Sequence, residues 1–458
     1  MSASTRVTFG TKLGIIAATA GSAVGLGNVW RFPSETANGG GAIFVFIYLA
    51  CVLFFGIPLV LAEFIIGRAG KANPAGAYRN LAPGKPFHYF GIFAVVAVML
   101  ILSFYMVVAG WTFDYFALAL TGKLSNLSEP SAFKNIFSDL ANNPWRQTFW
   151  LGVSVISTAV IVGFGVKKGI ELASKLMMPL LFLILLVMCI RAITLPNASE
   201  GLIYLFRPDL SNVTPQVFVS ALGQAFFSLS LGMGCLITYA SYFGPDVRLG
   251  KTAGQLAVVD TSVAVLAGIT IFSTAFAVAG ADSKEITEAL SNGGPGLIFE
   301  TLPQLFQALP LGQLWAALFF FLLILATITS AISMYEIATA FLHEEFNISR
   351  INSVVLTSAF TLVAGYFAAD SLGGNSSFVF FGKTLFDWLD AITATWMMPL
   401  GGLFVSWFTG WYLDKKLVRA QLSNNDTTAI RFFRTYIFLL RYVAPIGIII
   451  IFLVSLLK

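Results

Sequence analysis

The chain has few charged residues: 11% of its 458 residues are Asp, Glu, Lys or Arg, while 57% are hydrophobic. Soluble domains carry about 25% charged residues, so a water-soluble fold of this length would lack the polar surface that it needs. The composition therefore argues against a soluble enzyme, a nucleic-acid-binding protein and a disulfide-rich scaffold. It predicts a polytopic membrane protein, and we attribute the net charge of +5 to the placement of Lys and Arg relative to a bilayer.

Cysteine and histidine are also scarce. The three cysteines, Cys51, Cys189 and Cys235, lie in apolar segments and are too far apart for a metal motif, so we expect them to pack in the interior. The two histidines, His88 and His343, form no HExxH motif, and no serine elbow is present. An enzyme is therefore not expected. A channel is not expected either, because no filter repeat or continuous polar stripe is visible.

Long apolar stretches are abundant. A membrane-spanning helix needs about 20 mostly apolar residues, and the sequence predicts 11 such spans within one transmembrane domain that covers residues 1–458. The expected spans are 10–34, 41–67, 88–120, 148–165, 169–194, 214–243, 250–279, 311–343, 351–369, 379–411 and 432–456. Most of the 27 lysines and arginines then fall on the side of the N-terminus. This bias places the N-terminus in the cytoplasm and the C-terminus outside a cell membrane.

Two of these spans are interrupted near the middle. The first contains GSAVGLGN at 21–28, and the sixth contains FSLSLGMG at 227–234. Irregular backbone within a bilayer is tolerated where it lines a cavity or binds a ligand. Breaks in the first and sixth spans indicate two inverted five-helix repeats, about 10–194 and 214–411, with 432–456 as an additional helix. Close helix packing through small residues is the alternative.

These motifs resemble the neurotransmitter:sodium symporter family. The run from Gly21 to Pro33, GSAVGLGNVWRFP, resembles the first helix of that family. Further similar signatures are Gly39-Gly-Gly-Ala42, Gly56-Ile-Pro58, Glu63, Gly67-Arg68 and the run FFSLSLGMG at 226–234. Eleven spans instead of the usual twelve resemble the bacterial branch of the family. The resemblance implies a sodium-coupled secondary symporter of hydrophobic aliphatic and aromatic L-amino acids that works by alternating access.

The resemblance also implies two sodium sites. Ala326, Thr329 and Ser330 are spaced i, i+3, i+4, so one helix face presents a carbonyl and two hydroxyls. By resemblance they join the carbonyls of Gly21 and Val24 in the second sodium site. The residues expected at the first sodium site are Ala23, Asn28, Ser228 and Asp260. Hydrogen bonding between helices is the alternative role for the Thr and Ser pair.

Asp260 is a carboxylate inside the span expected at 250–279. An unpaired charge there costs a few kcal/mol or more. The family commonly has an amide at this position, and many animal members need chloride nearby. Because Asp260 supplies a fixed negative charge, and Ala264 stands where some members have serine or glutamate, we expect transport that does not require chloride. The alternative is that Asp260 is protonated or solvated by a water-filled channel.

For the substrate, the resemblance implies a pocket in which Tyr105 and the N–H groups of Leu26 and Gly27 meet the carboxylate. The residues expected to bind substrate are Ala23, Val24, Leu26, Gly27, Ile101, Tyr105, Phe227, Ser228, Ser230, Met233, Ser330 and Met334. The wall expected to face the substrate side chain is apolar, which favours hydrophobic amino acids, and it consists of Val24, Ile101, Tyr105, Phe227, Met233, Ser330 and Met334. Gly25 occupies the position at which amine carriers have an aspartate, so a monoamine substrate is disfavoured.

Gate residues follow from the same resemblance. Arg31 and Asp390 are expected to pair outside, above an aromatic lid of Tyr105 and Phe227. Arg6 and Glu344 are expected to pair inside. Anchoring of Arg6 by the positive-inside rule and snorkelling of Arg31 are the alternatives.

Two further features belong to the inner half. Glu63 is expected to support the unwound part of the sixth span. The stretch from Gly169 to Pro179 is expected to unwind locally, because glycine and proline weaken a helix.

Two other functions remain open at this stage: a carrier of the same fold for an amine or osmolyte, and an amino-acid sensor that does not transport. The partners expected are the amino acid, two Na⁺ ions and the lipid bilayer, with no nucleic acid and no obligate protein partner.

Overall fold

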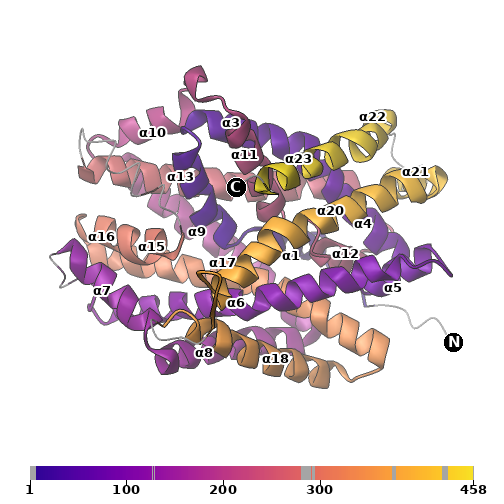
Figure 1. Cartoon of the computed structure of the whole chain (residues 1–458), viewed down its shortest axis with the longest axis horizontal. Coiled ribbons are helices and arrows are strands. Elements are labelled where there is room, and N and C mark those ends of the chain that lie inside the picture. Colours follow the sequence, from indigo (N-terminus) through magenta and orange to yellow (C-terminus); the bar gives the residue numbers. More distant parts are fainter. Residues whose placement is uncertain are drawn as a thin grey trace.

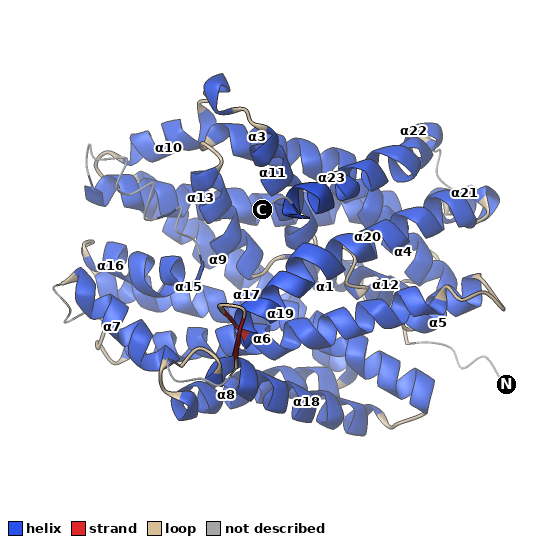
Figure 2. Ribbon diagram, viewed as in Figure 1, coloured by secondary structure: helices blue, strands red, loops and turns tan. Residues whose placement is uncertain are grey.

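The computed structural model describes residues 7–125, 127, 129–279, 290, 294–373, 378–424 and 432–456. This part of the chain is almost wholly helical (Figures 1 and 2). A small hairpin of β1 (Val379–Phe380) and β2 (Lys383–Thr384) pairs in antiparallel register. The expected all-α polytopic fold is confirmed.

Eight helices of the described residues are long and apolar enough to cross a membrane, or nine if one bent pair is counted as a span. Four of them are single α-helices without an internal change of helix type, namely α6 (His88–Leu120), α13 (Leu249–Ala279), α17 (Gly312–Phe346) and α18 (Arg350–Asp370). The other four contain π-helical turns. Two of them are α3 (Ala42–Cys51), η2 (Val52–Gly56) and α4 (Ile57–Gly70), and η3 (Val166–Glu171) with α9 (Leu172–Ile193). The other two are α19 (Leu385–Asp390), η6 (Ala391–Met397), α20 (Met398–Trp407) and η7 (Phe408–Tyr412), and α22 (Phe433–Phe438), η8 (Leu439–Val443) and α23 (Ala444–Leu456).

The bent pair is the first expected span. α1 (Lys12–Ala23) begins at Thr11, whose side chain caps the amide of Gly14, and η1 (Gly27–Arg31) continues into α2 (Phe32–Asn38) at an angle of 53°. The remaining two expected spans are also helical. They form α8 (Pro144–Gly163) and the pair α11 (Pro215–Ser228) and α12 (Cys235–Ser241), but neither meets the same length and hydropathy criteria.

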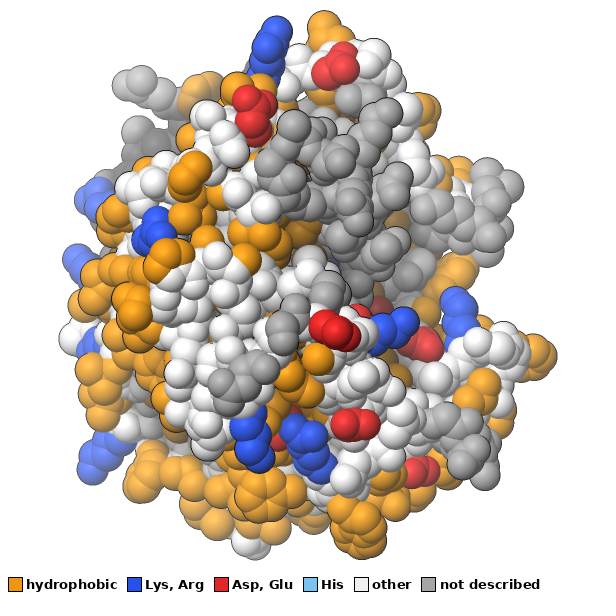
Figure 3. Space-filling view, turned by 90° about the vertical axis from the view of Figure 1, so that its left-hand side faces the viewer, with side chains coloured by type: hydrophobic (Ala, Val, Ile, Leu, Met, Phe, Trp, Pro, Cys, Tyr) orange, Lys and Arg blue, Asp and Glu red, His pale blue; other side chains and the backbone are white. Residues whose placement is uncertain are grey.

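Connections outside the spans contain short helices. These are α5 (Pro74–Leu81), α7 (Pro130–Ala141), α10 (Ala198–Phe206), η4 (Leu210–Asn212), α15 (Gly294–Gly296), η5 (Leu297–Thr301), α16 (Leu302–Gln307) and α21 (Lys415–Ser423). In Figure 1, α5, α21 and α22 lie at one end of the molecule, and α7, α10 and α16 lie at the other. Figure 3 views the latter end, where charged side chains of both signs are interspersed with polar surface and hydrophobic side chains gather towards the margin.

Helix α17 is the most deeply buried of the eight candidate spans. It packs against α1, α6, α9 and α18, so the first interrupted span lies against the centre of the bundle. The second interruption lies between α11 and α12, at residues 229–234. There Ser230, Gly232 and Gly234 adopt φ values of 52°, 79° and 77°. A left-handed backbone is costly for serine, and such strain typically persists at functional sites.

Candidate functional site

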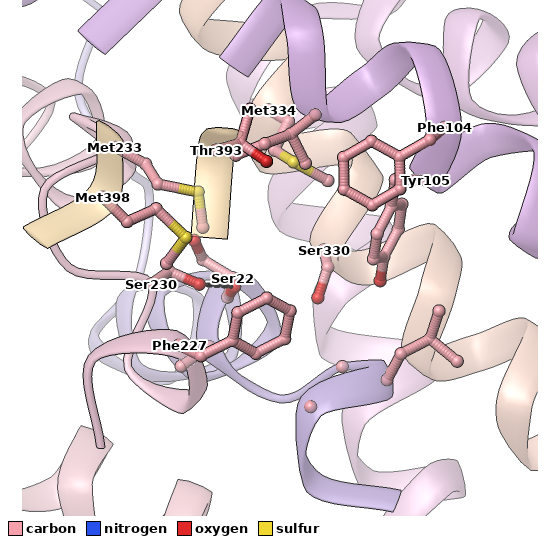
Figure 4. Close-up of a pocket in the computed structure, with 15 residues that line it drawn as sticks. Ser22, Phe104, Tyr105, Phe227, Ser230, Met233, Ser330, Met334, Thr393 and Met398 are labelled. Carbon is pink, nitrogen blue, oxygen red and sulfur yellow. Dashed lines mark hydrogen bonds between the residues drawn. The ribbon is translucent and has the colours of Figure 1, made fainter. Parts of the chain in front are cut away.

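A central cavity lies where the two interruptions meet. It is lined by 15 residues. Its lining residues come from both broken spans and from α6, α17 and the η6–α20 helix, and they are Ser22, Ala23, Gly25, Leu26, Gly27, Ile101, Phe104, Tyr105, Phe227, Ser230, Met233, Ser330, Met334, Thr393 and Met398 (Figure 4). The cavity is therefore enclosed by parts of the chain that are far apart in sequence.

Ten of the twelve residues expected to bind substrate line this cavity. Val24 and Ser228 are not among its lining residues. Val24 is fully buried, with its carbonyl turned towards the Ser330 hydroxyl on α17. The Ser228 hydroxyl instead donates to Asp260. Both residues therefore face the neighbouring helices rather than the cavity.

Five lining residues were missed, namely Ser22, Gly25, Phe104, Thr393 and Met398. Ser22, Gly25 and Phe104 are direct neighbours of residues that were expected. Thr393 and Met398 had no signal in the sequence. Thr393 lies within the π-helical segment η6 and Met398 follows its last residue, and η6 alters the helical register in the middle of a stretch that looks like an ordinary apolar helix.

The polar end of the cavity is formed by Tyr105 and by the start of η1. The hydroxyl of Tyr105 is buried without a hydrogen-bond partner among the described residues. The N–H groups of Leu26 and Gly27 lie at the beginning of a helical turn, where no intrahelical acceptor exists. A Cβ atom on Gly25 would lie 2.5 Å from Ser330 Oγ and 3.3 Å from the Tyr105 hydroxyl oxygen. This end of the cavity thus presents donors and has no room for a side chain at Gly25.

Oxygen atoms converge around Asn28, where the first sodium site is expected. Its amide nitrogen lies 3.1 Å from Ser228 Oγ, 3.1 Å from the Asp260 carbonyl oxygen and 2.8 Å from Asp260 Oδ1. Ser228 Oγ donates to Asp260 Oδ2 at 2.6 Å. The Tyr48 hydroxyl lies 3.3 Å from Ser228 Oγ and 3.4 Å from Asp260 Oδ2. Three of the four residues expected at this site are therefore in direct contact, and the fourth, Ala23, is the last residue of α1.

Asp260 is completely buried, and none of the ion pairs among the described residues includes it. Its hydrogen-bond partners are neutral. A buried carboxylate surrounded by neutral groups needs a proton or a cation. The donor set of carboxylate, hydroxyl and carbonyl oxygens is that of a hard cation such as Na⁺.

The residues of the second expected sodium site lie between α1 and α17. Ser330 Oγ is 3.4 Å from the Gly21 carbonyl oxygen and 3.0 Å from that of Val24. Thr329 Oγ1 donates to the carbonyl of Ala326 at 3.1 Å, and to that of Leu325 at 2.8 Å. A Cβ atom on Gly21 would lie 3.2 Å from Thr329 Cβ, so the two helices are in close contact here. All five expected residues thus meet at one helix crossing.

The expected outer pair of Arg31 and Asp390 is not formed in this structure. Arg31 instead pairs with Glu35 one turn further along the same helix, at 3.5 Å, because an i,i+4 neighbour is within easy reach. The Arg31 guanidinium also lies 5.0 Å from the centre of the Phe227 ring. Arg31 is therefore in contact with the aromatic lid while its expected ion pair is absent.

Of the expected inner pair, Arg6 lies outside the described residues. Glu344 accepts hydrogen bonds from the backbone and side-chain nitrogens of Asn73, at 2.7 and 3.1 Å. The same end of the molecule holds a network that sequence reasoning missed. Glu336, fully buried in α17, accepts from Tyr242 at 2.6 Å and pairs with Arg350 at 2.5 Å. Glu336 is a charge within an apolar span, so it carried the same signal that identified Asp260.

Glu63 supports the sixth span as expected, because its Oε1 accepts from the backbone of Gly232 at 2.7 Å. The stretch from Gly169 to Pro179 is helical in this structure, with a π-helical turn at its start. A Cβ atom on Gly169 would lie 1.9 Å from the Ile161 carbonyl oxygen. Here glycine is required for close packing of two backbones.

Comparisons with known proteins agree with this geometry. The sodium:neurotransmitter symporter family matches residues 6–135 and 134–458. An uncharacterized sodium-dependent transporter of Bacillus subtilis (strain 168), YhdH, is 34% identical over 99% of this chain and 98% of its own. An uncharacterized sodium-dependent transporter of Haemophilus influenzae is 34% identical over 98% of both chains.

The structure of MhsT in complex with L-phenylalanine superimposes with a TM-score of 0.88, at 40% identity over 98% of this chain and 99% of that one. The interrupted helices, the enclosed cavity and the buried oxygen clusters thus occur in a chain whose whole length matches these sodium-dependent transporters. The protein belongs to the sodium:neurotransmitter symporter family.

Proposed function

We propose that this protein carries hydrophobic L-amino acids, both aliphatic and aromatic, into the cell together with sodium and without a requirement for chloride. The observation that carries this proposal is the asymmetry of the central cavity. One end offers the buried Tyr105 hydroxyl and the N–H groups at the start of η1, while most of the remaining lining is apolar, including Ile101, Phe227 and Met233. A zwitterion with an apolar side chain fits both ends.

Two sodium ions are cargo in this proposal. The first binds at Asn28, Ser228 and Asp260 with the Ala23 carbonyl, next to the position of the substrate carboxylate. The second binds between α1 and α17, at Ser330 and its neighbours. Because the first ion and the substrate carboxylate attract each other directly, each raises the affinity for the other, and this coupling is reciprocal.

Chloride independence follows from Asp260. Its carboxylate supplies the negative charge that balances a sodium ion in a completely buried site. An amine substrate is disfavoured, since Gly25 leaves no room for the carboxylate that such a ligand would need. Of the relatives, MhsT was solved with L-phenylalanine, which is consistent with a hydrophobic amino acid.

The proposed transport cycle uses two inverted repeats, 10–194 and 214–411, that alternate access to the cavity. The N-terminus lies in the cytoplasm, so α5 and α21 are at the inner end and α7 and α10 at the outer end. Each positive charge moved inward gains about 2.3 kcal/mol per 100 mV of membrane potential.

The test is binding of radiolabelled leucine and tryptophan to the purified protein, with sodium titrated against potassium and with chloride or gluconate as the anion. We expect saturable binding that requires sodium and is equal in both anions. Binding that is equal in potassium would contradict sodium coupling, and loss of binding in gluconate would contradict the role given to Asp260. Sodium-driven uptake into proteoliposomes then separates a transporter from a sensor.

A further inference from the structure

A second cavity lies beside the central one. We call it the outer cavity, and it is lined by Arg31, Glu35, Gln216, Ser220 and residues of η6, α20 and α23. Two residues line both cavities, namely Phe227 and Met398. We therefore call these two side chains the partition between the two cavities.

The two halves of this partition differ in how they are held. Phe227 is held by a cation–π contact, in which the Arg31 guanidinium lies 5.0 Å from the centre of the Phe227 ring. Met398 is 2% exposed and has an unbranched, flexible thioether side chain. In Figure 4 the Met398 side chain extends from the edge of the cavity into the space between Met233 and Phe227.

The backbone at Met398 has a fixed position. Its carbonyl oxygen would lie 2.1 Å from a Cβ atom on Gly232, so α20 and the unwound segment 229–234 are in direct backbone contact. The Gly232 amide is in turn held by Glu63 at 2.7 Å. A change of rotamer at Met398 can therefore open the partition without a movement of α20. The main chain at Met398 moves only together with the unwound segment 229–234 that it contacts.

We propose that Met398 controls exchange of substrate between the central cavity and the outer cavity, so that the length of this side chain sets the rates of substrate association and dissociation from outside. This inference rests on the proposed function. It adds a residue of α20 to the aromatic lid of Tyr105 and Phe227 that the family resemblance implies.

The experiment measures association and dissociation rates of radiolabelled leucine separately, in saturating sodium, on the full-length protein in nanodiscs. In M398A both rates are expected to rise by at least about threefold, because a thinner partition lowers the barrier in both directions. In M398F both rates are expected to fall. M398L keeps the length of the side chain approximately and is expected to stay within about twofold of the wild type.

Met334 provides a matched control, because it lines the central cavity and not the outer one. M334A is expected to raise the dissociation rate by loss of contact and to leave the association rate unchanged. The distinctive result for Met398 is thus a faster association, which loss of a contact does not produce.

The proposal is overturned if M398A raises only the dissociation rate, as M334A does, or changes neither rate. If M398A does not give a folded protein, M398F decides: slower association and dissociation support the partition, and unchanged rates overturn it. Sodium-dependent leucine binding to the wild-type protein is measured before any variant is compared. Its absence would overturn the proposed function itself.

Discussion

Ser228 Oγ donates a 2.6 Å hydrogen bond to the carboxylate of Asp260. This bond joins the last residue of α11, immediately before the unwound segment, to the interior of α13. An ion bound at this carboxylate is therefore coupled through one side chain to the backbone that lines the substrate cavity.

Replacement of Asp260 by asparagine removes the only formal charge of this cluster. A unit charge about 4 Å from an ion contributes up to about 4 kcal/mol at an effective dielectric constant of 20, so we expect D260N to weaken sodium binding by at least about tenfold. We also expect its leucine uptake to become greater in chloride than in gluconate. Sodium titrations of leucine uptake in the two media measure both effects. Wild-type sodium affinity in D260N would contradict the assignment of this site.

The second ion site is tested by T329A. The hydroxyl lost in this variant is one of the proposed ligands, and a hydrogen bond or ligand contact to a charged group contributes about 1.5–3 kcal/mol, so the sodium concentration for half-maximal binding should rise by about tenfold or more. The matched control is T327A. Thr327 is also buried in α17 and, like Thr329, donates its hydroxyl to a carbonyl of the same helix, that of Ile324, but it is not one of the proposed sodium ligands. Equal sodium curves for the two variants would argue against the site.

Gly25 tests the geometry of the polar end of the cavity. A methyl group there would meet Ser330 Oγ at 2.5 Å, so G25A should lower the affinity for leucine by about 5- to 150-fold, which corresponds to an overpacking cost of about 1–3 kcal/mol. Gly254 is the control, because a Cβ atom there has no neighbour within 4 Å. G254A is expected to bind leucine normally. Unchanged binding in G25A would show that this end of the cavity is wider than described.

Gly169 yields a different expectation from the one that its spacing to Pro179 suggested. If the stretch from Gly169 to Pro179 unwinds locally, G169A should slow inward release and spare binding. Because its Cβ atom would clash with the Ile161 carbonyl, we now expect a lower unfolding temperature instead, whereas G152A, which meets nothing within 4 Å, should be unchanged. Thermal unfolding of purified protein measures this. P179A is the better test of local unwinding, with slower inward release at unchanged affinity as the expected result.

The Glu336–Arg350 pair makes a further stability prediction. Removal of one partner from a buried ion pair typically costs 3–5 kcal/mol, so R350M should lower the unfolding temperature and reduce uptake. The double variant E336Q/R350M leaves no unpaired charge and should recover part of the loss. Additive effects of the two substitutions would show that the residues do not interact energetically.

The amino-acid sequence alone determined the class of this protein and the position of its site. Small and polar residues at 21–28 and 227–234 interrupt apolar spans, and such interruptions persist in a bilayer only where they serve a cavity or ligand. Resemblance then identified ten of the cavity residues and the oxygens that meet at Asp260 and Ser330. These residues could be found in the sequence because each belongs to a local motif.

Only the tertiary structure decided which distant residues complete the site. Thr393 and Met398 reach the cavity because η6 inserts π-helical turns, and the resulting change of register is invisible in an evenly apolar stretch. Glu336 pairs with Arg350, and Arg31 with Glu35 rather than Asp390, because side-chain partners depend on helix packing. The requirement for glycine at Gly169 is likewise set by the backbone of another helix, which no local pattern records.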